Sequence, residues 1–170
     1  MARRVFFSFH YQNDIFRVNT VRNHWLTKSD RDDAGYWDHS LWEATKLRGD
    51  QALKKLIEDG LYGTSVTAIL IGAETAGRKW VNYEIQRSHE LGKAIIGVYI
   101  HQIRCAKTKR IDARGRNPLA DFYFDTANGR KYLSGVYPTY DWVNDDGYNN
   151  FADWVEDAYQ TAFFPKKNLW

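Results

Sequence analysis

The chain has 170 residues, close to the roughly 150 residues typical of one domain, and a net charge of +3. Hydrophobic residues make up 44% and charged residues 26%, as in ordinary globular proteins. The single cysteine, Cys105, excludes an internal disulfide and a multi-cysteine metal site. No secretory leader precedes the first predicted strand and no apolar run could span a membrane. We therefore expect one cytoplasmic domain over residues 1–170.

Short apolar runs predict the strands of the sheet. Continuous apolar runs are typical of strands that are buried on both faces, and they occur at 5–9, 66–71 and 94–100. Residues 30–34 are polar and are predicted to form a loop. A short second strand is predicted at 35–38, and a last one within 134–143.

Three- and four-residue spacing of apolar side chains predicts the helices between these strands. The first would begin at Asp14, whose carboxylate could cap it. The second surrounds 53–61 and would be closed by Gly60 and Gly63. A third runs from about 80 to 91, and a last one, starting near 147, would end at Pro165. Alternating strands and helices predict an α/β fold with an open, mostly parallel sheet and helices on both faces.

The stretch between 101 and 133 lacks a clear period. It crowds basic residues from Arg104 to Arg116 together with Gly115 and Pro118. We expect 101–133 to be a mobile surface insertion, and we expect a flexible linker to replace residues 104–116 with little loss of stability. The basic residues could contact nucleic acid, but no aromatic platform is interleaved with them. A solvated loop explains them better, so nucleic acid is not an expected partner.

The segment 80–85 carries the strongest functional signal. Trp80 and Glu84 are four residues apart and share one helix face, just after the predicted strand at 66–71. Ligands of open parallel sheets bind at this carboxyl edge. A carboxylate beside an aromatic ring suits binding a ribose and stabilising positive charge on it. The alternative is a solvated carboxylate that pairs with Arg87 or Ser88.

Other chemistries lack their patterns. There is no glycine-rich phosphate loop of the GxGxxG or GxxxxGK[ST] type and no GxSxG elbow. The five histidines do not have HExxH spacing, so no metal site is predicted. Ser8, Phe9, His10 and Asn13 follow or end the first predicted strand and are candidate substrate contacts, together with Trp80. Ser8 could instead be a small buried filler, Phe9 a core residue and Trp80 a packing residue.

Two motifs resemble those of a known family. Val5-Phe6-Phe7-Ser8-Phe9-His10 resembles the first-strand signature of TIR domains, and Trp80-Val81-Asn82-Tyr83-Glu84-Ile85 resembles their Trp-x-x-x-Glu helix. The segments 4–12, 16–25 and 140–149 resemble the stand-alone TIR-like proteins of the Thoeris antiphage defence system. Residues 38–49 do not resemble the loop through which signalling TIR domains assemble.

The resemblance implies a flavodoxin-like fold and an enzyme in which Glu84 is catalytic. NAD would be the substrate rather than a cofactor, and it would be cleaved and cyclised to a cyclic ADP-ribose isomer without a metal. A phage-derived trigger would activate the enzyme, possible self-assembly would complete it, and the diffusible product would activate a separate effector. The aromatic segment 36–42 could gate the pocket. Two alternatives stay open: a non-catalytic adaptor, and a nucleic-acid-binding factor built on residues 104–116.

Overall fold

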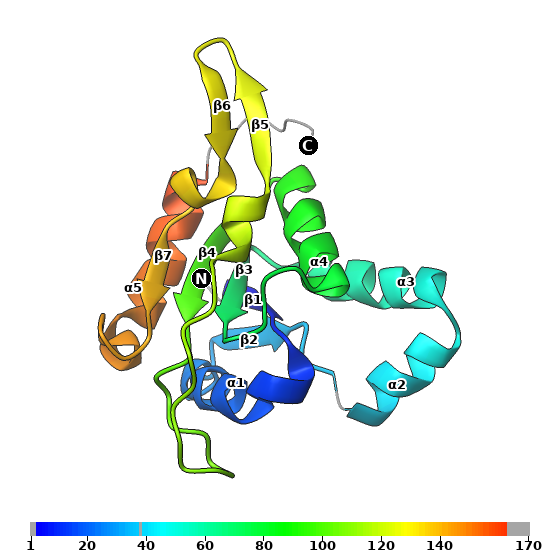
Figure 1. The fold of residues 1–170 in the computed structure, drawn as a ribbon, viewed down its shortest axis with the longest axis vertical. Coiled ribbons are helices and arrows are strands. Elements are labelled where there is room, and N and C mark those ends of the chain that lie inside the picture. Colours follow the sequence, from blue (N-terminus) through cyan, green and yellow to red (C-terminus); the bar gives the residue numbers. More distant parts are fainter. Residues whose placement is uncertain (1–2, 38, 163–170) are drawn as a thin grey trace.

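The computed structural model describes residues 3–37 and 39–162. At its centre lies a parallel five-stranded sheet with the strand order β2-β1-β3-β4-β7 (Figure 1). The strands are β1 Arg3–Ser8, β2 Arg31–Ala34, β3 Val66–Ile71, β4 Ala94–Tyr99 and β7 Thr139–Asp141. This order matches the flavodoxin-like arrangement, in which the chain reverses direction across the sheet between β1 and β3. The predicted α/β fold with an open parallel sheet is confirmed.

Helices cover both faces of the sheet, as expected. They are α1 Tyr11–Trp25, α2 His39–Leu47, α3 Asp50–Leu61, α4 Lys79–Glu90 and α5 Gly147–Thr161. Side chains of α1 and α5 pack on one face, and those of α3 and α4 pack on the other. The pair α2 and α3 extends to one side of the sheet (Figure 1).

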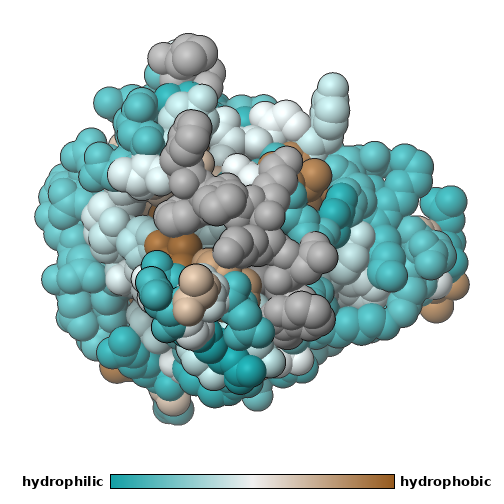
Figure 2. Space-filling view, turned by 90° about the horizontal axis from the view of Figure 1, so that it is seen from above, coloured by the Kyte–Doolittle hydropathy of each residue, from teal (hydrophilic) through white to brown (hydrophobic). Residues whose placement is uncertain are grey.

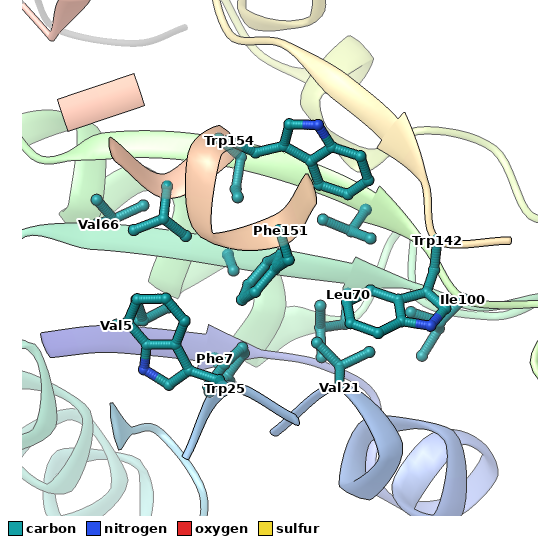
Figure 3. Close-up of a cluster of buried hydrophobic side chains, with 14 of the residues drawn as sticks. Val5, Phe7, Val21, Trp25, Val66, Leu70, Ile100, Trp142, Phe151 and Trp154 are labelled. Carbon is teal, nitrogen blue, oxygen red and sulfur yellow. The ribbon is translucent and has the colours of Figure 1, made fainter. Parts of the chain in front are cut away.

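The core follows from the alternation of side chains along each strand. On β1, Val5 and Phe7 join the cluster under α1 and α5, where Figure 3 shows them near Phe151 and Trp25. Phe6 points to the opposite face and packs against α3. Both faces are apolar because both are covered, which explains the continuous apolar runs.

The prediction for the second strand is wrong by four residues. Residues 31–34, which were predicted to form a loop, form β2. Residues 35–37, which were predicted to be a strand, follow β2 without strand structure, and Asp38 lies outside the described residues. β2 pairs only with β1 in the described sheet, so its side chains need not be apolar. Its polar groups are used instead: Arg22 forms an ion pair with Asp33, and the Trp25 indole donates to the Asp32 carbonyl.

Two helix ends also differ from the prediction. Helix α1 begins at Tyr11, so Asp14 does not cap it and is instead fully buried. Gly60 lies inside α3, at a position where a Cβ would press on Phe6 and Trp37. The helix ends at Leu61, and Gly63 follows it with φ of +75°. The proposed stop at Pro165 lies outside the described residues.

The expectation that 101–133 is a surface insertion is wrong for its second half, which packs on the core. The segment contains two 3₁₀ turns, η1 Pro118–Asp121 and η2 Leu133–Gly135, around a hairpin of β5 Tyr123–Thr126 and β6 Gly129–Tyr132. Leu119, Phe122 and Leu133 are buried in the cluster on the α4 face. The segment thus serves as the crossover from β4 to β7 and supplies part of the core.

The view from above shows mostly hydrophilic residues, with hydrophobic ones in small separate patches (Figure 2). Within residues 3–37 and 39–162, none of the helices has the length and hydropathy to cross a membrane.

Candidate functional site

A cavity of about 320 Å³ opens at the carboxyl edge of the sheet, beside β1 and β3. Four segments line it: the start of α1, the turn after β2, helix α2, and the first turns of α4. The lining residues are Phe9, His10, Tyr11, Gln12, Gly35, Trp37, Trp42, Glu43, Lys46, Arg78, Lys79, Trp80, Val81 and Glu84. The cavity therefore occupies the crevice where flavodoxin-like folds bind their ligands.

Glu84 lies at the inner end of this cavity and is only 4% exposed. Its carboxylate accepts a hydrogen bond from the hydroxyl of Ser8, the last residue of β1. Ser8 is fully buried and does not line the cavity. The alternative of a solvated Glu84 is wrong, because Arg87 pairs with Glu58 and Glu90, and Ser88 hydrogen-bonds Thr67.

Burial raises the pKa of the Glu84 carboxyl from 4.5 to about 8, while the hydrogen bond from Ser8 lowers it. A carboxylate deprived of water favours its neutral form unless a positive charge is nearby. A cationic ligand in the cavity would supply that charge. Strongly shifted carboxyl groups in clefts are characteristic of functional sites.

Aromatic rings form part of the cavity wall. Trp37 and Trp42 stack on each other with ring centroids 5.5 Å apart, and both line the cavity. Trp80 closes it from the α4 side and packs edge to face against Tyr83 at 6.0 Å. Flat apolar side chains in the lining of a cavity suit a ligand with planar rings.

Basic side chains line part of the cavity, and each of them also forms an ion pair with a nearby carboxylate. Arg78 and Lys79 stand at the N-terminus of α4, and Lys46 reaches the cavity from α2. The N-termini of α1 and α4 both meet the cavity, and helix N-termini attract anions. Burial and then the Arg78 charge lower the pKa of His10, while Glu74 raises it. The site thus combines two helix N-termini and paired basic side chains with a buried carboxyl.

The structure brings most predicted site residues together. Phe9, His10, Trp80 and Glu84 line the cavity, and Ser8 contacts Glu84. Asn13 is the exception: it lies on the far side of α1 from the cavity and donates hydrogen bonds to Asp112 and Asp14. Its placement as a substrate contact is therefore corrected.

Sequence reasoning overlooked Tyr11, Gln12, Glu43, Lys46 and Arg78 as site residues. Three of these precede or start a helix at the sheet edge, a position that could have suggested them. Glu43 and Lys46 reach the cavity only because α2 folds back over it, which no local pattern indicates. Within the described ranges, no three His, Cys, Asp or Glu side chains gather as metal ligands would.

Comparison with known proteins gives the family. The model of the family described as "Thoeris protein ThsB, TIR-like domain" matches residues 6–104. A protein of Bacillus cereus (strain MSX-D12) is 45% identical over 192 aligned positions, covering 91% of this chain and 100% of the relative. That relative carries the provisional name cyclic ADP-D-ribose synthase ThsB1. The matched region contains every residue that lines the cavity. The chain belongs to the TIR-like domain family of the Thoeris protein ThsB.

Proposed function

We propose that this chain is an antiphage defence enzyme that converts NAD into a cyclic ADP-ribose isomer. The observation that carries the proposal is the buried Glu84 carboxyl, held by Ser8 at the inner end of an aromatic-walled cavity. The printed name of the Bacillus cereus relative supports the same reaction. NAD is thus a substrate here and no cofactor is required.

The reaction begins with cleavage of the bond between the ribose C1′ and the nicotinamide nitrogen. The bonding pair leaves with nicotinamide, whose ring becomes neutral, and positive charge moves to C1′ and the ring oxygen. The carboxylate of Glu84 stabilises that charge from within a site sheltered from water. A nucleophilic atom of the adenosine half of the same molecule then attacks C1′ and forms the new bond that closes the ring, and its proton passes to solvent water.

The change of Glu84 from the neutral to the charged form fits this chemistry. Before NAD binds, the raised pKa, about 8, leaves the group largely neutral at pH 7. The positively charged nicotinamide ring of bound NAD favours the carboxylate, because opposite charges stabilise each other in a low-dielectric site. Substrate binding therefore generates the charged form that the transition state needs.

The remaining residues match the other parts of NAD. Arg78 and Lys79 line the cavity beside the α4 N-terminus, which supports a role in attracting the pyrophosphate. Trp37, Trp42 and Trp80 offer faces for the two planar rings. An adaptor that binds only proteins would gain nothing from a buried carboxyl without a cationic partner, since such burial costs stability. This favours the enzyme over the adaptor.

We also propose how the enzyme acts in defence. A phage-derived trigger starts synthesis, and the cyclic product diffuses to a separate effector. Self-assembly and movement of the aromatic segment 36–42 complete the pocket, with Trp37 and Trp42 as the movable wall. This arrangement would keep the resting enzyme from consuming cellular NAD.

The test replaces Glu84 by Gln and follows nicotinamide and cyclic product by mass spectrometry, in infected cells and with purified protein plus an infected-cell extract. We expect turnover to fall about 10²- to 10³-fold, the usual cost of removing one electrostatic group from a preorganised site. Glu90→Gln is the matched control, because Glu90 is exposed on the same helix and its replacement should leave turnover unchanged. Equal turnover by both variants would refute the assignment of Glu84.

A further inference from the structure

The segment 103–116, here called the basic finger, projects from the body of the molecule. In Figure 1 it lies at the opposite end of the long axis from the β5–β6 hairpin. It exposes the cations Arg104, Lys107, Lys109, Arg110, Arg114 and Arg116. Within the described residues only the last of these forms a salt bridge, with Asp121. The finger therefore carries a concentrated and largely uncompensated positive charge.

The finger is held in one shape by its base. Arg17, only 5% exposed, donates hydrogen bonds from Nε to the Ile103 carbonyl at 2.9 Å and from Nη2 to the Arg110 carbonyl at 3.1 Å. The backbone N–H of Cys105 donates to the Arg110 carbonyl at 3.0 Å, and that of Lys109 donates to the Cys105 carbonyl at 2.8 Å. A charged surface that is already ordered loses little conformational entropy on binding.

The base of the finger also contacts the loop that leads into the candidate active site. Gly115 lies so close to this loop that a Cβ would collide with the carbonyl oxygens of Gly72 and Ala73. On the other side, Asn13 donates to Asp112 at 3.0 Å. Residues 72–78 connect β3 to α4, whose first turns carry Trp80 and Glu84.

A buried polar network links the same parts through α1. The Thr75 hydroxyl donates to Asp14 at 3.4 Å and accepts from the Gly72 N–H at 2.8 Å. Asp14 is fully buried and lies 4.0 Å from Arg17, which holds the finger. A displacement of the finger would therefore reach the 72–78 loop through Arg17 and Asp14 as well as through Gly115.

We propose that the basic finger is a docking surface for an acidic protein surface and that docking there alters the 72–78 loop. Positive and negative surfaces attract over several ångströms and align during encounter. The docking itself does not depend on the proposed function; its consequence for NAD turnover does. The regulated element would be the start of α4, which positions Glu84.

An acidic protein fits better than a nucleic acid. Ile111 is 56% exposed in the middle of the cations, and an apolar anchor among arginines is characteristic of protein interfaces. Binding of single-stranded nucleic acid uses aromatic stacking platforms, and the finger contains no aromatic residue. A double-stranded nucleic acid could bind through the positive charges alone, so the experiment also measures binding of a DNA duplex.

The experiment measures binding of fluorescent poly-L-glutamate, as the acidic polypeptide, and of a fluorescent DNA duplex. The two double variants are Lys107→Glu with Arg110→Glu in the finger, and Lys28→Glu with Lys131→Glu outside it. All four side chains are exposed, and both variants change the net charge equally. Hydrogen exchange of residues 72–78 with and without poly-L-glutamate reports the coupling. None of these readouts requires NAD turnover, so failure of the proposed function is tested separately by Glu84→Gln.

We expect the finger variant to bind poly-L-glutamate at least about tenfold more weakly than the wild type, and the control variant to stay within about threefold. Poly-L-glutamate should change exchange at 72–78 in the wild type and in the control variant only. Equal binding by the two variants would overturn the docking surface. Binding without a change at 72–78 would overturn the coupling, and tighter binding of DNA that is lost in the finger variant would reassign the partner.

Discussion

Two buried carboxyl groups, Glu84 and Asp14, lie at the same edge of the sheet but in opposite surroundings. Glu84 has one hydrogen-bond donor, Ser8, and borders an open cavity. Asp14 receives hydrogen bonds from Asn13 and Thr75 and lies 4.0 Å from Arg17. Burial raises both pKa values, to about 8 for Glu84 and to about 6 for Asp14, where the Arg17 charge opposes the rise.

This difference in compensating charge indicates a structural role for Asp14 and a ligand-binding role for Glu84. Asp14 is compensated from within the protein, so its charge holds α1, the 72–78 loop and the basic finger together. Glu84 is compensated only in part, so its charge becomes favourable when a cation enters the cavity. A buried carboxyl without an internal cation is costly to keep, and such a cost is accepted where function requires it.

The largest expected effect is on the pH dependence of stability. The folded pKa of Glu84, about 8, is raised above its ordinary value of 4.5, so the folded state holds this proton more tightly. Its contribution is complete below about pH 4.5 and is lost as the pH rises through about 8. Glu84→Gln should remove this loss, which is at most about 1.4 kcal/mol for each pH unit. Urea unfolding of both proteins from pH 5 to 9 measures it; parallel curves would contradict the shift.

Asp14→Ala should destabilise the fold at pH 7 by about 2 to 3 kcal/mol, because buried Arg17 would lose a compensating charge. The loss of stability should be smaller than for a buried Arg17 without any carboxylate nearby, because Asp112 remains 3.8 Å from Arg17. Asp153→Ala, on the exposed face of α5, is the control and should change stability by less than about 0.5 kcal/mol. Unfolding free energies from urea titration decide the matter, and equal values would show that Asp14 is not structural.

The rate of the proposed reaction should rise with pH. The carboxylate is the active form, so kcat/KM with NAD should increase about tenfold for each pH unit below the pKa of the free enzyme and level off above about pH 8. The residual activity of Glu84→Gln should not follow this profile. A wild-type rate that falls between pH 6 and 8 would show that a protonated group is required instead.

The smallest effect is expected from Ser8→Ala. The Ser8 hydroxyl lowers the pKa of Glu84, so its loss should move the pH profile of kcat/KM to higher pH and reduce the rate a few-fold at pH 7. KM should change little, because Ser8 does not line the cavity. Ser8→Thr, which keeps a hydroxyl, should restore part of the profile. An unchanged profile in Ser8→Ala would mean that Ser8 only fills space.

Local patterns predicted the elements that depend on local pattern. The apolar runs at 5–9, 66–71 and 94–100 became β1, β3 and β4, and helical spacing located α3, α4 and α5. They failed at β2, whose polar residues are stabilised by an edge position and by partners on α1. They also failed at 101–133, where scattered apolar residues such as Leu119 and Leu133 reach the core from an irregular chain.

The sequence alone therefore determined the fold class and the helix that carries Trp80 and Glu84, because strand burial and helical spacing are written in neighbouring residues. Only the tertiary structure decided which side chains meet. It brought Ser8 to Glu84 across 76 positions, folded Trp42 over the cavity, and took Asn13 away from it. It also buried Glu84 instead of leaving it in solvent. The burial of Glu84 and its hydrogen bond from Ser8 both depend on chain segments that are far apart in sequence. Together they determine the pKa of Glu84, on which the proposed chemistry depends.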